Sequence, residues 1–116
     1  MPKETDEEKA ARSKAIADAT VGATEVPFEV MKMADEGFDV IQELLGKSNP
    51  NAVSDLGVAV LNLMSCMKGA WLNVKINLPG LKDEEMAARF ASEGKAFIEK
   101  NEALARRLYK EIEESL

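Results

Sequence analysis

The sequence predicts an all-α fold, a bundle of three long helices, and two observations carry this prediction. Apolar residues recur every three or four positions over long stretches that proline and glycine rarely interrupt, which is the period of an amphipathic helix. Hydrophobic residues make up 46% of the chain but aromatic residues only 5%, so alanine, leucine, valine and methionine must fill the core, as they do in helical bundles. At 116 residues, the chain is expected to form one helical domain over residues 1–116.

The first helix is predicted over about residues 5–46. Thr5 and Glu8 have the spacing of a capping box, in which each side chain bonds to a free backbone amide at the helix start. Alanines recur every four residues through the first half of this helix, which permits close packing against another helix. Pro27 removes one backbone hydrogen bond and clashes with the preceding turn, so we expect a bend or a brief break there. Gly46 is the predicted stop.

The second helix is predicted over residues 52–78, with Asn51 or a neighbour as its cap. This stretch contains no proline and two glycines. On a helical wheel, a polar line falls within about 20° of one common direction, on the side away from the two lysines of the helix; its members are Asp55, Asn62, Cys66 and Asn73. We expect this line to face inward, where each polar group needs a partner from another helix or a ligand.

The third helix follows a turn at residues 78–82, which contains Pro79 and Gly80. Asp83 is its predicted cap, and its apolar positions are Met86, Phe90, Phe97, Leu104, Leu108 and Ile112. Three helices cannot cover an apolar middle helix completely. We therefore expect oligomerisation to complete the bundle, as a two-fold homodimer or a higher homo-oligomer, with the second helix at or near the interface.

Charge and composition exclude several classes of partner and chemistry. A net charge of −6 and a pI near 4.8 argue against nucleic acid as a partner. No stretch of about 18 apolar residues and no signal-like start is present, so we expect no membrane partner and a cytoplasmic location. The chain has no histidine and one cysteine, which excludes an internal disulfide, a histidine-based triad and a cysteine cluster for zinc. We predict no metal.

Proton transfer near neutral pH would therefore depend on a carboxylate, a lysine, Cys66 or Tyr109. Asp55 fits by type, as a carboxylate on the polar line, although it could instead stabilise the first turn of its helix. Asn73 and Asn77 lie four residues apart, and their amides can donate to and accept from a polar ligand. They could equally form bonds between helices or cap the helix end. Cys66 among leucines is typical of a small buried hydrophobe.

Four segments carry a family resemblance. They read PKETDEEKAAR from Pro2, VPF around Pro27, NPNAVSD from Asn49 and NVKINLPGLKDEE from Asn73. In this order and spacing, they resemble the formiminotetrahydrofolate cyclodeaminase and methenyltetrahydrofolate cyclohydrolase family. The chain departs from the family pattern at Ser48, where glycine is usual, and at Phe28, where a smaller aliphatic residue is common.

The resemblance implies that the chain corresponds to the C-terminal half of the family's domain, because a glycine-rich motif of the first half is lacking. It implies an enzyme with a tetrahydrofolate derivative as substrate. The reaction is either a lyase reaction, closure of an N5-formimino group onto N10 with loss of ammonia, or hydrolysis of a methenyl bridge to 10-formyl folate. The alternative is a non-catalytic helical oligomerisation module, which the missing half and the regular alanines favour.

The resemblance also implies roles for single residues. Asp55, in the Ser-Asp motif, is the implied catalytic residue. Lys3 and Arg12 match family positions and are placed to meet the glutamate tail of folate, whereas solvated first-turn roles are the alternative. The full set of implied substrate-binding residues is Lys3, Arg12, Asn49, Ser54, Asn73 and Asn77. For Ser54 the alternative is a structural role at the helix start.

Overall fold

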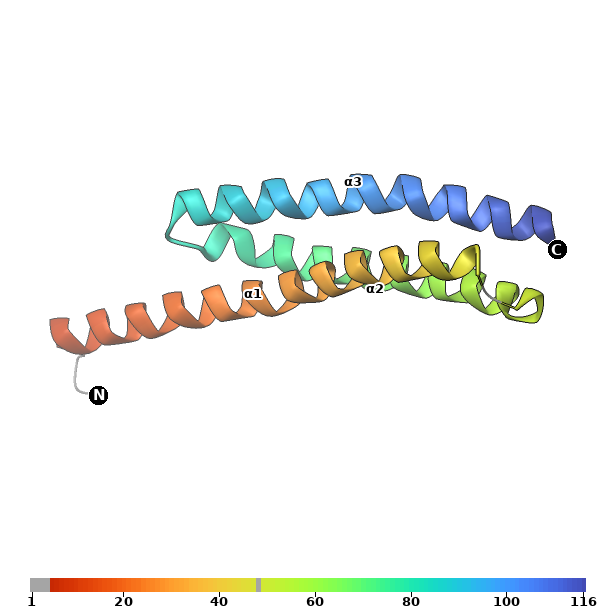
Figure 1. The fold of residues 1–116 in the computed structure, drawn as a ribbon. Coiled ribbons are helices and arrows are strands. Elements are labelled where there is room, and N and C mark those ends of the chain that lie inside the picture. Colours follow the sequence, from red (N-terminus) through yellow and green to blue (C-terminus); the bar gives the residue numbers. More distant parts are fainter. Residues whose placement is uncertain (1–4, 48) are drawn as a thin grey trace.

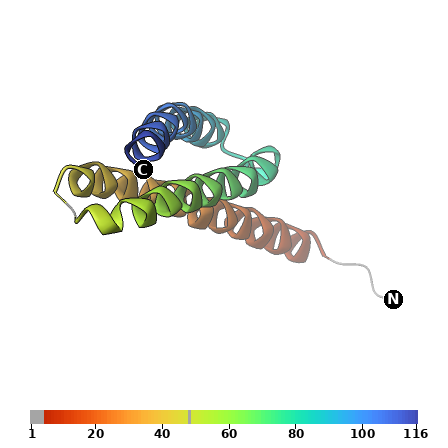
Figure 2. The same ribbon diagram turned by 90° about the vertical axis from the view of Figure 1, so that its right-hand side faces the viewer.

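The structure, a computed structural model, describes residues 5–47 and 49–116 and is all-α in that part of the chain. Three long helices follow one another: α1 (Asp6–Leu45), α2 (Val53–Asn77) and α3 (Glu84–Ser115). Figure 1 shows the three side by side, with the N-terminal end of α1 extending past the turn between α2 and α3. In the view of Figure 2, α3 lies on one side of the pair formed by α1 and α2. The predicted fold class is confirmed.

Helix α1 begins as predicted and then continues through its proline. Thr5 Oγ1 accepts a hydrogen bond of 3.1 Å from the amide of Glu8. The helix is uninterrupted at Pro27, so the expectation of a break is wrong, and Figure 1 shows no sharp kink there. Two residues around the proline, Thr24 and Phe28, are buried against the rest of the bundle, and this packing holds the helix in register across the missing bond.

The connections contain short 3-10 turns, Pro50–Ala52 before α2 and Leu78–Gly80 before α3. Asn49 caps the first of them, because its side chain accepts 2.9 Å from the amide of Asn51, and α2 then starts without a side-chain cap of its own. Asp83 caps α3 as predicted, with Oδ1 accepting 3.0 Å from the amide of Met86.

The core lies where the three helices meet. From α1, Phe28 packs its ring against Phe90 and Phe97 of α3, with ring centroids 5.0 and 5.9 Å apart. From α2, Trp71 packs against α3 at Gly94, where an added Cβ would be 2.2 Å from the indole ring. The glycine therefore sets how closely α2 and α3 approach.

One polar cluster ties α1 to α3. Asp35 Oδ1 accepts from Asn101 Nδ2 and from Lys100 Nζ, both at 2.9 Å, and Asn101 is fully buried. Partial burial by itself raises the pKa of Asp35, but the hydrogen bonds from Asn101 and Lys100 outweigh it, and the pKa lies below its ordinary value. The carboxylate is thus held in its charged form.

The polar line of α2 does not face inward in the described chain. The buried side of α2 is formed by Val60, Met67 and Val74, which pack against α1 and α3. The polar line lies roughly 100–140° further around the helix, and Asp55, Asn62, Cys66 and Asn73 are all exposed. The expectation that these groups point into the bundle is therefore wrong.

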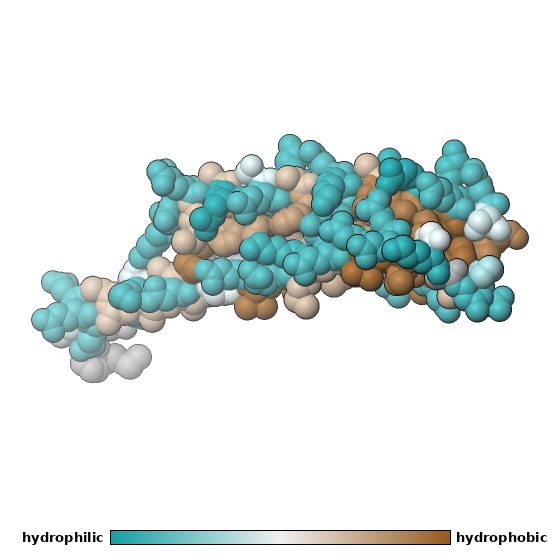
Figure 3. All heavy atoms as spheres, viewed as in Figure 1, coloured by the Kyte–Doolittle hydropathy of each residue, from teal (hydrophilic) through white to brown (hydrophobic). Residues whose placement is uncertain are grey.

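Large exposed apolar side chains also gather on α1 and α2. Of the eleven in the described residues, Tyr109 belongs to α3 and Leu116 follows directly after it. The nine others are Ile16, Val26, Met33, Val40, Leu44, Val58, Leu61, Leu72 and Ile76. Figure 3 shows apolar residues along the edge of α1 that faces away from α3. Among the described helices, none is both long and apolar enough to cross a membrane.

Candidate functional site

A groove of about 580 Å³ runs between α1 and α2, and we call it the α1–α2 groove. None of its lining residues comes from α3. The lining residues are Ala23, Val26, Pro27, Val30, Ser65, Cys66, Gly69, Ala70, Asn73 and Asn77. The structure therefore brings two of the predicted site residues, Asn73 and Asn77, into one depression. The lining residues include no carboxylate, lysine or arginine, and the wall is mostly apolar, with Ser65, Asn73 and Asn77 as its polar side chains besides the Cys66 thiol.

The proline of α1 and the last turn of α2 explain the polar end of this groove. Because Pro27 has no N–H, the carbonyl of Ala23 has no donor from its own helix. Asn77 Nδ2 lies 3.4 Å from that carbonyl oxygen and donates 2.9 Å to the carbonyl of Asn73. If the side-chain amide of Asn77 were flipped, its oxygen would face two carbonyl oxygens, and no hydrogen bond could form. The nitrogen must therefore point at the two carbonyls. Asn77 Oδ1 is left as an acceptor.

The sequence left two roles open for Asn77, binding a ligand or bonding to another helix. The structure shows the second, because Asn77 of α2 reaches the carbonyl of Ala23 in α1. Asn73 differs, because its side chain is exposed and makes no hydrogen bond within the described residues. Its amide offers two donors and one acceptor. Together the two asparagines present a neutral set of donors and acceptors, which suits a flat polar ring better than an anion.

The second group of predicted site residues lies at the opposite end of α2. Asp55 and Ser54 are exposed in its first turn, and the side-chain oxygen of Asn49 is occupied as the cap of the preceding 3-10 turn. Asp55 precedes Asn73 by eighteen positions, which corresponds to about 27 Å along a helix. Within one chain, the candidate catalytic carboxylate therefore does not reach the groove.

Of the two predicted cations, Arg12 lies beyond the other end of the groove. Arg12 is exposed on the extending part of α1. It precedes Ala23 by eleven positions, or about three helical turns, so the two residues share one side of α1 and are about 16 Å apart along it. Lys3 lies outside the described residues.

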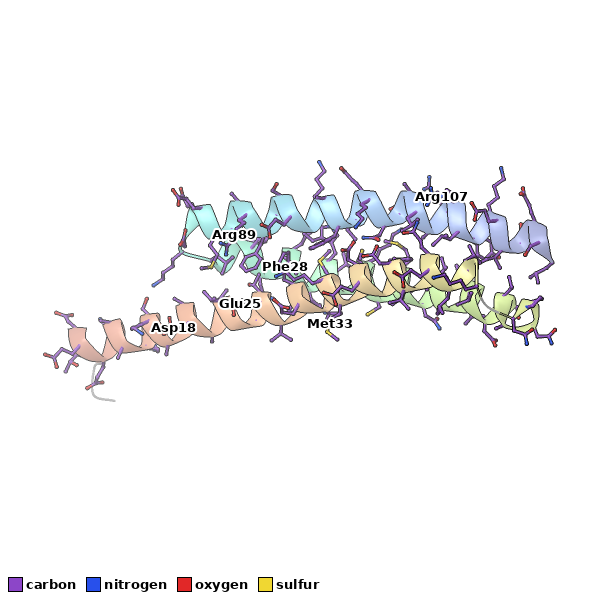
Figure 4. The ribbon with its side chains drawn as sticks, in the orientation of Figure 1. Asp18, Glu25, Phe28, Met33, Arg89 and Arg107 are labelled. Carbon is purple, nitrogen blue, oxygen red and sulfur yellow. The ribbon has the colours of Figure 1, made fainter. Side chains whose placement is uncertain are left out.

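A further groove of about 400 Å³ lies between α1 and α3, and sequence reasoning did not anticipate it. Its floor is aromatic and its rim is charged. Lys32 lies over the ring of Phe28 at 5.4 Å, and Arg89 over the ring of Phe90 at 5.7 Å, and Figure 4 shows Phe28 and Arg89 in the space between the two helices. The sequence signal that could have indicated this groove is a basic residue next to a core phenylalanine or four positions from it. In the described residues, no group of three or more cysteines and carboxylates could hold a metal ion.

Comparison with known proteins identifies similar chains. Residues 1–96 match the profile of the formiminotransferase-cyclodeaminase family. The methenyltetrahydrofolate cyclohydrolase of Methylorubrum extorquens is 38% identical over 112 residues, which are 97% of this chain and 54% of that protein. The formimidoyltransferase-cyclodeaminases of Rattus norvegicus and Sus scrofa are each 33% identical, over 72% and 77% of this chain. The chain spans about half the length of the first relative and 16% of the other two.

Proposed function

The chain belongs to the formiminotransferase-cyclodeaminase family, and from this membership we propose that it acts on a tetrahydrofolate derivative as a cyclodeaminase or a methenyltetrahydrofolate cyclohydrolase. The observation that carries the proposal is the 38% identity to a protein named for the second activity, which extends over 97% of this chain. We propose a cytoplasmic location, because a chain with one cysteine forms no internal disulfide and does not need an oxidising compartment to fold.

We propose that the α1–α2 groove receives the pterin ring. The ring is flat, and its edge alternates N–H donors with nitrogen and oxygen acceptors. Asn73 can meet both kinds of group, whereas Asn77 offers only Oδ1, because its N–H groups are directed at the carbonyls of Ala23 and Asn73. The glutamate tail would then extend along α1 toward Arg12, with Lys3 as a second candidate for the tail carboxylates. In this proposal Asn49 and Ser54 belong to the opposite end, with Asp55.

Both reactions need a group that handles a proton. In the hydrolysis, water adds to the bridge carbon, the bond from that carbon to N5 breaks, and one proton is released. In the deamination, N10 attacks the formimino carbon and the former imino nitrogen leaves as ammonia, with net uptake of one proton. We propose Asp55 as the catalytic residue that carries this proton. Because it lies about 27 Å from Asn73 along α2, another copy or another segment must bring the two together.

The alternative function is a helical oligomerisation module without catalysis. The nine exposed apolar side chains of α1 and α2 favour it, as does the lack of a carboxylate among the groove's lining residues. We propose homo-oligomerisation under either function, because large exposed apolar side chains on two neighbouring helices mark an interaction surface.

The test combines turnover with binding. Hydrolysis is followed through the loss of methenyltetrahydrofolate absorbance, and binding through the fluorescence of Trp71, the single tryptophan of the chain. The proposed function predicts saturable binding of a reduced folate and turnover above the spontaneous rate. Self-association without any folate binding would contradict the proposed enzyme function and support the oligomerisation module.

A further inference from the structure

The polar line of α2 has a symmetric spacing. Its members stand at positions 55, 62, 66 and 73, so the intervals are seven, four and seven residues, centred on position 64. All four side chains are exposed on one side of the helix. If two copies of this line are laid against each other in opposite directions about that centre, Asp55 faces Asn73 of the other copy and Asn62 faces Cys66. Each polar group then meets a complementary one.

Small residues follow the same centre. Ala59 and Gly69 flank the polar line at positions 59 and 69, five residues on either side of position 64. An added Cβ at Gly69 would meet nothing within 4 Å, so packing inside the described chain gives no reason for a glycine there. Small side chains at both positions would let a second helix approach closely, because interaxial distance depends on the residues at the contact.

Helix α1 points to the same centre independently. Gly37 packs against Leu63 of α2, whose Cδ1 would lie 3.0 Å from an added Cβ, and so it lies level with position 64. The exposed residues Met33 and Val40 stand about one turn before and after Gly37, at 68% and 53% exposure. In an antiparallel pair, Met33 of one copy would pack beside Val40 of the other. Figure 4 shows Met33 on the side of α1 away from α3, where a second copy has access.

We infer that a second copy of this chain packs antiparallel onto the groove-bearing side of α1 and α2, across a two-fold axis at the level of Gly37 and Met64, and that each copy supplies Asp55 to the groove of the other. The inference of the interface depends only on the symmetric spacing of the polar line and on the exposed residues. The shared site rests in addition on the proposed function.

The identity of the occupant follows from the polar line. Covering amides and a carboxylate costs free energy unless each finds a partner. In the two-fold pair, the Asp55 carboxylate accepts from the amide of Asn73 of the partner subunit, and Asn62 contacts Cys66 of the partner subunit. A different partner would have to repeat the seven-four-seven spacing with complementary groups, which a second copy provides by symmetry. The arrangement also removes the separation of about 27 Å between Asp55 and Asn73.

The interface is tested with a single engineered thiol. Asn62→Cys places a thiol opposite the native Cys66 of the partner subunit, so mild oxidation should give a covalent dimer held by two symmetric disulfides. Glu113→Cys is the matched control, because it adds an exposed thiol on α3 and keeps Cys66. We expect rapid cross-linking of the first variant only. Equal rates for the two variants, or a monomer in sedimentation at micromolar concentration, would overturn the interface.

A second variant separates association from folding. Gly69→Leu has open space in one chain and replaces glycine with a better helix former, so the monomer should become more stable to urea. The same side chain blocks the close approach of α2 to its partner, so sedimentation should show loss of the dimer. An unchanged dimer in this variant would contradict the inference.

Mixing two inactive variants tests the shared site. Asp55→Asn and Asn73→Ala should each abolish turnover as homodimers. After mixing, half of the dimers are mixed, and one of the two sites in each mixed dimer is intact, so turnover should recover to about a quarter of wild type (1/2 × 1/2). No recovery despite proven mixing would overturn the shared site. A wild type without turnover would instead remove the proposed function, and the cross-linking result would still decide the interface.

Discussion

At the scale of single residues, Asn77 does more than its type suggested. It faces the carbonyl that Pro27 leaves without a helical donor, and it also donates to the carbonyl of Asn73. We predict that Asn77→Ala lowers the free energy of unfolding by about 1 kcal/mol, the usual worth of such bonds. Asn51→Ala is the control, since that side chain is exposed, lies outside the groove and makes no hydrogen bond in the described residues. Urea unfolding of both variants measures the difference, and equal stabilities would deny Asn77 this role.

The ionised carboxylate of Asp35 contributes to the stability of the folded state. Its pKa lies below the ordinary value of 3.8, because the bonds from Asn101 and Lys100 outweigh the effect of burial. A carboxylate with a lowered pKa stabilises the folded state above the unfolded pKa, and that stability is lost as the pH falls through the folded pKa. We predict that wild type exceeds Asp35→Asn in stability by a constant amount above about pH 5, and that the gap closes below pH 3.8. Urea titrations at several pH values measure it, and a gap that widened in acid would contradict the sign.

Some residue roles were accessible to sequence reasoning and others were not. The caps Thr5 and Asp83 were predicted correctly, because their bonds reach only three residues along the chain. The pairing of Asn73 with Asn77 followed in the same way from one helical turn. The relation of Asn77 to Pro27 spans fifty residues and depends on how α1 and α2 lie side by side, which the spacing within each helix does not contain.

At the scale of helices, the contact of α2 with α3 is set by Trp71 on Gly94. An added Cβ at Gly94 would lie 2.2 Å from the indole ring, so the ring or the helix must move. We predict that Gly94→Ala destabilises the fold by about 1–3 kcal/mol despite the better helix propensity of alanine. Trp71 fluorescence should shift in the folded state.

Gly22→Ala is the matched control, because an added Cβ there meets nothing within 4 Å. This substitution should stabilise α1 by up to about 1 kcal/mol. If both alanines stabilised the protein alike, close approach at Gly94 would not be what separates α2 from α3.

The helical wheel of α2 shows what a single element reveals and what it leaves open. The wheel correctly grouped Asp55, Asn62, Cys66 and Asn73 on one side. It could not tell which side the neighbours cover, since Val60, Met67 and Val74 form an equally coherent stripe. The apolar stripe is the side that packs against α1 and α3. Its burial gains transfer free energy, whereas a buried polar line would need a partner for each polar group. The same packing determined where the α1–α2 groove lies.

At the scale of the whole molecule, charge opposes the dimer that the polar line favours. Each copy carries a net charge of −6, so a pair carries −12. Glu36 precedes Gly37 at the inferred axis and is exposed, so the two copies of this residue lie near each other at the rim of the interface. Electrostatic attraction between the two copies is therefore missing. The apolar residues and the polar line must supply the attraction.

We therefore predict that added salt strengthens the dimer. Raising the ionic strength from about 0.01 to 0.15 M shortens the screening length from about 30 to 8 Å and weakens the repulsion between the copies. Sedimentation equilibrium should show a smaller dissociation constant at the higher salt concentration. Glu36→Gln should flatten this dependence, whereas Glu113→Gln, which removes the same charge from the far end of α3, should flatten it less. A dimer that weakens as salt is added would mean that opposite charges hold it together, and the antiparallel arrangement about Gly37 would then be incorrect.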